Sequence, residues 1–136
     1  MSLKKQEGTG RTKEFGFKRF LKSFKNSIDG LLNAYKNEQS LYLHAGASII
    51  VIILGIILKI SFSDWAIILI SLIVVLAIEL INTAIEAIVD LITTDYHILA
   101  KIAKDSGSAA TFVTSVVAGI ICAFILVPKI LVFLNR

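Results

Sequence analysis

The 136-residue chain has one cysteine, one proline and one tryptophan, and only 18% of its residues are charged. The single cysteine, Cys122, excludes an intramolecular disulfide, and its apolar neighbours predict an inert packing residue. Pro128 is the one proline and there is no low-complexity stretch, so the sequence offers no linker between two domains. The low charge accompanies 56% hydrophobic residues, which is too many for an ordinary soluble domain. We therefore expect one membrane-embedded domain over residues 1–136.

Two kinds of motif are also missing. The first 40 residues hold no apolar core of the kind that a cleavable signal peptide needs, so we expect no leader. The sequence has no Walker A loop, no kinase glycine-rich loop and no HRD motif. A kinase built on this chain would therefore be of an unrelated type.

The positive charge is concentrated near the N-terminus, because nine of the fourteen Lys and Arg precede Leu41. A strongly apolar remainder follows, so we assign this block to anionic lipid headgroups and not to nucleic acid. Residues 1–14 are polar and predicted to be disordered. Residues 15–37 carry aromatic and aliphatic side chains at helical spacing with lysines mostly elsewhere, which is typical of an amphipathic helix in the membrane interface. A disordered basic tail is the alternative.

Three long apolar stretches predict transmembrane helices at 41–58, 65–89 and 106–128. The first and third contain no Lys, Arg, Asp or Glu, and Trp65 anchors the start of the second at an interface. A polar loop is predicted at 93–105. Three spans place this loop on the same side as the N-terminus, and that side holds eleven of the fourteen Lys and Arg. The positive-inside rule then predicts a cytoplasmic N-terminus and an external C-terminus.

The second span ends in the sequence ELINTAIEAIVD, whose polar residues share one helical face. At about 100° per residue, Glu79, Asn82, Glu86 and Asp90 fall on one stripe, which we call the acidic face. Such a face is costly in lipid and is a functional-site hypothesis by default. Counting roughly 1.5 Å per residue from Trp65, Glu79 lies about 21 Å into a core about 30 Å thick. Glu79 can therefore meet a lipid-borne group, and Glu86 a group from water.

Acidic residues beside lysines at a membrane surface suit a Mg²⁺–nucleotide, because Mg²⁺ prefers one or two carboxylates plus phosphate oxygens. We assign Glu86 and Glu38 to the metal and Lys104 to phosphate. The deeper Glu79 is assigned to the acceptor hydroxyl, where phosphoryl transfer needs a base or a positioning group.

Structural roles remain open for these residues. Glu79 and Asn82 are alternatively hydrogen-bonding partners between helices. Asp90 is as typical of a helix end or an ion pair as of a catalyst. The same holds for three residues of the predicted loop, which are also typical of solvated side chains: His97, Lys104 and Asp105.

Two motifs together resemble one family. E-x-x-N-T-A-I-E-x-x-x-D (Glu79–Asp90) followed by A-K-D-x-G-S-A-A (Ala103–Ala110) is similar to the small integral-membrane kinases, which comprise prokaryotic diacylglycerol kinases and the undecaprenol kinases of Gram-positive bacteria. The resemblance covers roughly Phe17–Phe124 and includes N-E at Asn37–Glu38 and D-Y-H at Asp95–His97. It implies an all-α homotrimer of three-helix subunits, each with a surface helix, in the bacterial cytoplasmic membrane. It also implies active sites shared between protomers and transfer of the ATP γ-phosphate to a lipid primary hydroxyl.

The resemblance further implies a role for each matching residue. Glu79 would be the catalytic base and contact the substrate, with Asn82 beside it at the acceptor. Glu38 and Glu86 would hold Mg²⁺, and Ser108 would line the substrate side of the site. The remaining residues would contact ATP or support its site: Arg19, Asn26, Asp90, Asp95, His97, Lys104 and Asp105.

Two positions depart from the family pattern and bear on the substrate. Asn26 stands where an aromatic ring is often found near the ATP base, and His44 where diacylglycerol-specific members often have an acid. The second departure favours an undecaprenol kinase, which would make undecaprenyl phosphate. The alternative is a diacylglycerol kinase that makes phosphatidic acid, and a third reading is a non-enzymatic membrane subunit. The expected partners are a lipid alcohol, the membrane and copies of the same chain, with no nucleic acid.

Overall fold

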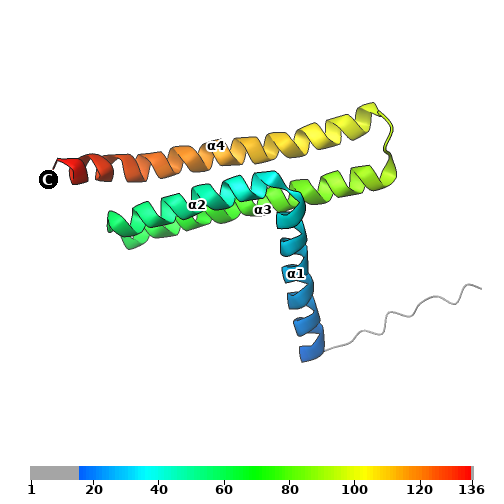
Figure 1. The fold of residues 1–136 in the computed structure, drawn as a ribbon, viewed down its shortest axis with the longest axis horizontal. Coiled ribbons are helices and arrows are strands. Elements are labelled where there is room, and N and C mark those ends of the chain that lie inside the picture. The colour runs from blue at the N-terminus through cyan, green and yellow to red at the C-terminus, as the bar shows by residue number, and fades with distance from the viewer. Residues whose placement is uncertain (1–15, 136) are drawn as a thin grey trace, which may run out of the picture. The chain divides into compact units, whose positions relative to one another are not determined.

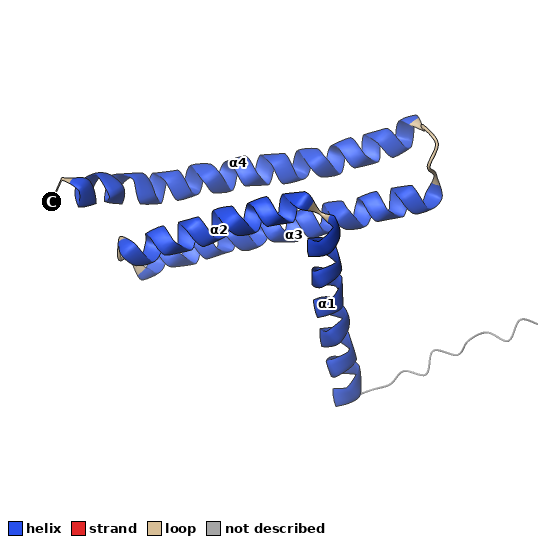
Figure 2. Cartoon of the chain, in the orientation of Figure 1, coloured by secondary structure: helices blue, strands red, loops and turns tan. Residues whose placement is uncertain are grey.

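The computed structural model describes residues 16–135 and is helical through most of that range, with no strand among those residues. The helices are α1 (Phe17–Asn37), α2 (Gln39–Ile57), α3 (Phe62–Ile92) and α4 (Ile98–Leu134) (Figures 1 and 2). The tail predicted to be disordered, 1–14, lies outside the described residues. The chain divides into two compact units, one ending at Leu32 and one beginning at Asn33.

The first unit contains most of α1, whose apolar side chains are exposed along one face. This face includes Phe17, Phe20 and Phe24, and the first two rings stack with centroids 6.5 Å apart. At 100° per residue the lysines of α1 fall beside this face and not on it. The helix is therefore amphipathic, as the spacing of its aromatic residues predicts.

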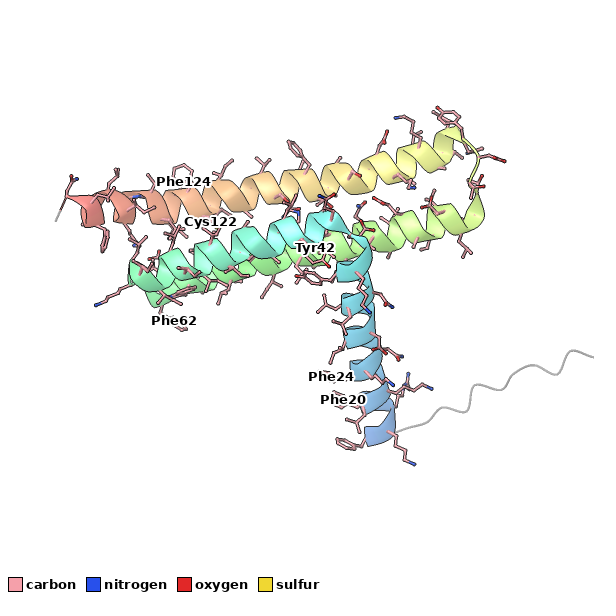
Figure 3. All side chains as sticks on the ribbon, viewed as in Figure 1. Phe20, Phe24, Tyr42, Phe62, Cys122 and Phe124 are labelled. Atoms are coloured by element: carbon pink, nitrogen blue, oxygen red, sulfur yellow. The ribbon has the colours of Figure 1, made fainter. Side chains whose placement is uncertain are left out.

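In the second unit, α3 packs along α4, and α2 contacts both (Figure 1). The core is a small apolar cluster in which Ile68 is fully buried, with Ile60, Cys122 and Leu126 buried around it. Cys122 lies on the face of α4 toward the other helices, as expected for a packing residue, whereas Phe124 is exposed (Figure 3). Most other large apolar side chains of these helices are also exposed. Exposed apolar surface of this extent suits a lipid environment.

The three helices α2, α3 and α4 are each long and apolar enough to cross a membrane. With 31 residues, α3 is about 46 Å long at 1.5 Å per residue, and so exceeds a hydrocarbon core of about 30 Å. The α3–α4 hairpin also extends past the first turn of α2 (Figure 1). The end of the bundle that carries the polar residues is therefore built from α3 and α4.

The predicted loop at 93–105 is wrong for its second half, because α4 begins at Ile98 and only residues 93–97 are non-helical. The His97 side chain caps the helix, with its Nδ1 accepting a hydrogen bond from the Leu99 N–H at 3.2 Å. The polar residues that suggest a loop instead lie on the exposed surface of a helix. At the other end, α4 continues beyond Pro128 to Leu134.

The α2–α3 turn is closed by local side-chain contacts. Ser61 and Asp64 form a capping box at the start of α3, with each side chain bonded to the other residue's backbone N–H at 3.1–3.2 Å. Asp64 also pairs with Lys129 of α4 at 3.0 Å. These contacts hold this end of α3 against α4.

Gly55 is buried against the Trp65 ring, and we predict that Gly55→Ala destabilises the bundle. An added Cβ would lie 2.8 Å from Trp65 Cη2 and 3.1 Å from Ile60 Cδ1, so the ring must move. Overpacking of this kind costs about 1–3 kcal/mol. Gly46→Ala on the same helix is the control, because nothing lies within 4 Å of its added Cβ. Thermal unfolding in detergent micelles should show a lower midpoint for Gly55→Ala alone, and equal midpoints would contradict this packing.

Candidate active site

The acidic face of α3 centres on Glu79, the one buried charged residue in the described part of the chain, with 3% of its surface exposed. The Ser40 hydroxyl, in the first turn of α2, donates a hydrogen bond to Glu79 Oε1. Glu79 Oε2 is buried and has no hydrogen-bond partner among the described residues. A buried acceptor without a partner costs about 1–3 kcal/mol and calls for an explanation. Glu79 is thus half-satisfied, with one oxygen available to a ligand.

Asn82 lies one turn further along the acidic face. Its Nδ2 donates to Glu86 Oε1 at 2.8 Å, and its Oδ1 is buried without a partner in the described chain. Gly107 of α4 lies directly against Oδ1, and a Cβ at that position would overlap this oxygen. The A-K-D-x-G-S-A-A motif therefore contributes a glycine that allows α4 to approach the carboxamide.

Glu38 is positioned at the start of α2, where it is the N-cap residue. Its half-buried side chain makes no capping hydrogen bond, so the carboxylate is not used by its own helix. The hydrogen bond between Ser40 and Glu79 brings this first turn of α2 beside the acidic face. Glu38 precedes Ser40 by two residues, and its place in the site stays a prediction.

A second polar cluster surrounds a cavity of about 470 Å³ at the α3–α4 connection. Lys104 Nζ pairs with Asp90 Oδ1 at 2.7 Å, and Lys101 pairs with Asp105. Lys104 therefore pairs with an acid of the neighbouring helix and not with Asp105. The cavity brings together five residues assigned to the nucleotide from sequence: Asp90, Asp95, His97, Lys104 and Asp105.

The remaining assigned residues have exposed side chains. Arg19 and Asn26 are exposed on α1 in the first unit. Ser108 is exposed on α4, next to Gly107. Their assigned roles stay predictions.

An apolar cavity of about 460 Å³ lies between α2, α3 and α4. Its lining includes Leu76, one turn before Glu79 on α3, and His44, one turn after Ser40 on α2. From there it continues along the bundle to Cys122. The volume is within the range of about 300–1,000 Å³ typical of small-molecule sites. An apolar cavity thus begins about one helical turn from the half-satisfied carboxylate.

Two residues of these sites are missing from the sequence interpretation. Ser40 has no sequence signal, since a serine near a helix start is more often a cap. Lys101 is four residues before Asp105, a spacing typical of an ion pair on a helix. Because the segment was predicted to be a loop, the helical spacing was not applied to it.

The donor atoms of the site suit Mg²⁺ better than a softer metal. No group of three or more His, Cys, Asp or Glu close enough to hold a metal occurs among residues 16–135. Glu38 and Glu86 offer carboxylate oxygens, and Glu86 keeps one oxygen beyond the one that Asn82 engages. One or two carboxylates completed by water and phosphate oxygens is the usual Mg²⁺ arrangement, whereas structural zinc requires four protein ligands.

A family model described as "Prokaryotic diacylglycerol kinase" matches residues 25–126, three quarters of the chain and both polar motifs. The chain belongs to the prokaryotic diacylglycerol kinase family. It is 39% identical over 112 residues to the undecaprenol kinase of Bacillus subtilis (82% of this chain, 91% of the relative). It is 35% identical over 114 residues to the diacylglycerol kinase of Haemophilus influenzae (84% and 97%). Identity to the diacylglycerol kinase of Escherichia coli K12 is 34% over 103 residues (76% and 84%).

Membership in the prokaryotic diacylglycerol kinase family confirms the resemblance stated from the two motifs. The family is a kinase family, for which ATP is the co-substrate. The three long apolar helices of the chain fit a membrane protein. The all-α fold class expected from sequence is confirmed as well.

Proposed function

We propose that this chain transfers the γ-phosphoryl group of ATP to the primary hydroxyl of undecaprenol, giving undecaprenyl phosphate. The observation that carries the proposal is the Glu79 carboxylate, buried at 3% exposure, with one oxygen held by Ser40 and the other without a partner in the described part of the chain. The apolar cavity that begins one turn away supports a lipid acceptor. A buried carboxylate about one helical turn from an apolar cavity suits a substrate with a polar head and a long apolar tail.

The chemistry assigned to Glu79 is general-base catalysis. The lipid hydroxyl donates its proton to Oε2 as its oxygen forms a bond to Pγ, and the bond from Pγ to the β–γ bridging oxygen breaks. The electron pair of that bond leaves with ADP. Asn82 lies beside the base, and its Oδ1, which has no partner within residues 16–135, is available to a group of the acceptor. Ser108 is assigned to the substrate side from sequence.

The nucleotide is assigned to the cavity at the α3–α4 connection. Three carboxylates line it (Asp90, Asp95 and Asp105) against two lysines that are both ion-paired (Lys101 and Lys104). This balance gives polyphosphate no excess of positive charge, so binding requires a cation. We assign that cation, Mg²⁺, to Glu38 and Glu86; when bound, it would neutralise charge on the phosphate oxygens.

Three further residues are proposed at the nucleotide from the family resemblance. His97 lines the cavity and also caps α4 through its Nδ1, which leaves Nε2 as the ring nitrogen that can contact a ligand. Arg19 and Asn26 of α1 complete the proposed set.

Undecaprenol is preferred to diacylglycerol as the acceptor for two reasons. His44 lines the apolar cavity at the position where an acid is often found in the diacylglycerol-specific branch, and the Bacillus subtilis relative is an undecaprenol kinase. Diacylglycerol is the second candidate, supported by the family description and the Haemophilus influenzae relative.

We further propose that residues 1–136 form one kinase domain that works as a homotrimer in the bacterial cytoplasmic membrane. The proposed spans are 41–58, 65–89 and 106–128. The excess of Lys and Arg before the first span and after the second supports a cytoplasmic N-terminus. The exposed apolar faces of α2, α3 and α4 leave room for contacts with other copies.

The substrate is tested with purified protein in bicelles containing Mg²⁺ and γ-labelled ATP, with undecaprenol or diacylglycerol at equal mole fraction. We expect undecaprenol to be labelled at least about tenfold faster, which corresponds to about 1.4 kcal/mol of discrimination. Faster labelling of diacylglycerol would keep the mechanism and change the substrate. Labelling of neither lipid would overturn the proposed function.

A further inference from the structure

We propose that Ser40 is a positioning residue, which fixes the Glu79 carboxylate so that Oε2 alone faces the lipid hydroxyl. This inference rests on the proposed function, since it concerns the same base. Ser40 belongs to neither of the motifs that define the family resemblance.

The contact itself carries the first step. Rotation about the last torsion of a glutamate side chain is broad and roughly two-fold, so a free carboxylate does not distinguish its two oxygens. The half-buried Ser40 hydroxyl donates to Oε1, which leaves Oε2 as the buried oxygen without a partner among the described residues. The serine thereby determines which oxygen is available to accept a proton.

The neighbours of Glu79 on α3 bond to other atoms. Thr83 Oγ1 donates to the backbone oxygen of Glu79 at 3.1 Å, and the Asn82 side chain donates to Glu86. The orientation of the carboxylate is therefore set from α2, not from its own helix.

The position of Ser40 in α2 gives the contact a second consequence. Ser40 is two residues after Glu38, the proposed metal ligand at the N-cap. The same helical turn therefore carries a metal ligand and the group that holds the base. A fixed distance between base and metal-bound nucleotide is what phosphoryl transfer by positioning requires.

Removal of the hydroxyl tests the role. In Ser40→Ala we expect kcat for the preferred lipid to fall about tenfold, with KM for the lipid changed less than about twofold, because orientation of the base matters mainly in the transition state. Ser40→Thr keeps a hydroxyl and should restore most of kcat. Ser71→Ala is the matched control, because its Oγ donates to Ile67 O of its own helix at 2.8 Å and Ser71 lines neither of the two cavities described within residues 16–135.

A double variant separates positioning from a merely structural link between α2 and α3. If Ser40 acts through Glu79, Ser40→Ala should have no further effect on the residual rate of Glu79→Gln. All rates are measured well below the unfolding midpoint of each variant.

The rates of these variants decide whether Ser40 positions Glu79. Wild-type kcat in Ser40→Ala, no rescue by threonine, or an undiminished effect in the Glu79→Gln background would overturn the positioning role and leave the proposed function intact. If wild-type protein labels neither lipid, the proposed function fails, and the role of Ser40 fails with it.

Discussion

Glu79→Gln should lower kcat for lipid phosphorylation by about 10²–10⁴-fold, the usual contribution of a general base. Glutamine has nearly the same shape and still accepts a hydrogen bond from Ser40, but its amide cannot take the lipid proton at this step. The protein should remain folded with an unchanged or higher unfolding midpoint, because the substitution removes a buried carboxylate that is only half satisfied. The measurement is transfer of label from γ-labelled ATP to lipid, with thermal unfolding on the same samples.

Asp29→Asn is the matched control for this prediction, because it makes the same change of carboxylate to amide at an exposed position of α1. It should retain wild-type kcat. A rate in Glu79→Gln within threefold of wild type would show that Glu79 is not the base. If no phosphorylation occurs in any variant or in wild type, the acidic face returns to the structural role of a hydrogen-bonding link between helices.

Glu86→Gln should lower the rate at limiting Mg²⁺ by at least about 10²-fold, since metal stabilisation of transferring phosphate contributes several kcal/mol. The glutamine oxygen still accepts the 2.8 Å hydrogen bond from Asn82 Nδ2, so the substitution removes the charge and preserves the contact. Because the lost interaction is with the cation, more Mg²⁺ should restore part of the rate. A titration of rate against Mg²⁺ at fixed ATP measures this shift.

The outcome distinguishes a metal ligand from a structural acid. The Mg²⁺ titration of Asp29→Asn should overlay that of wild type. If Glu86→Gln lowers the maximal rate but leaves the half-saturating Mg²⁺ concentration unchanged, Glu86 has another role and Glu38 remains the candidate ligand.

Much of the architecture follows from local sequence pattern. Long runs without charged residues predict three membrane spans, because a charged side chain is costly in lipid and this cost can be read from the composition of one segment. The helices α2, α3 and α4 each contain such a run. The helical repeat also predicts that Glu79 and Asn82 share a face. The boundaries of α4 are less predictable, because this helix begins at Ile98, nine residues before Gly107 and inside the predicted loop. 

The contacts between helices were decided by the tertiary structure. Hydropathy and helical spacing are properties of one segment at a time, whereas a partner across an interface depends on how far one helix is shifted and rotated along another. Nothing in the order of residues therefore indicates that Lys104 pairs with Asp90 and not with its neighbour Asp105. The close approach of Gly107 to Asn82 is likewise a result of α3–α4 packing.

The sequence alone determined the membrane-embedded all-α class, the acidic face and, through two motifs, the kinase family of this protein. Only the folded bundle decided which oxygen of Glu79 is held and which has no partner among the described residues, because that depends on where the first turn of α2 meets the middle of α3. Side-chain chemistry is encoded residue by residue, but the selection of one atom from two equivalent ones requires a neighbour 39 positions away in the chain.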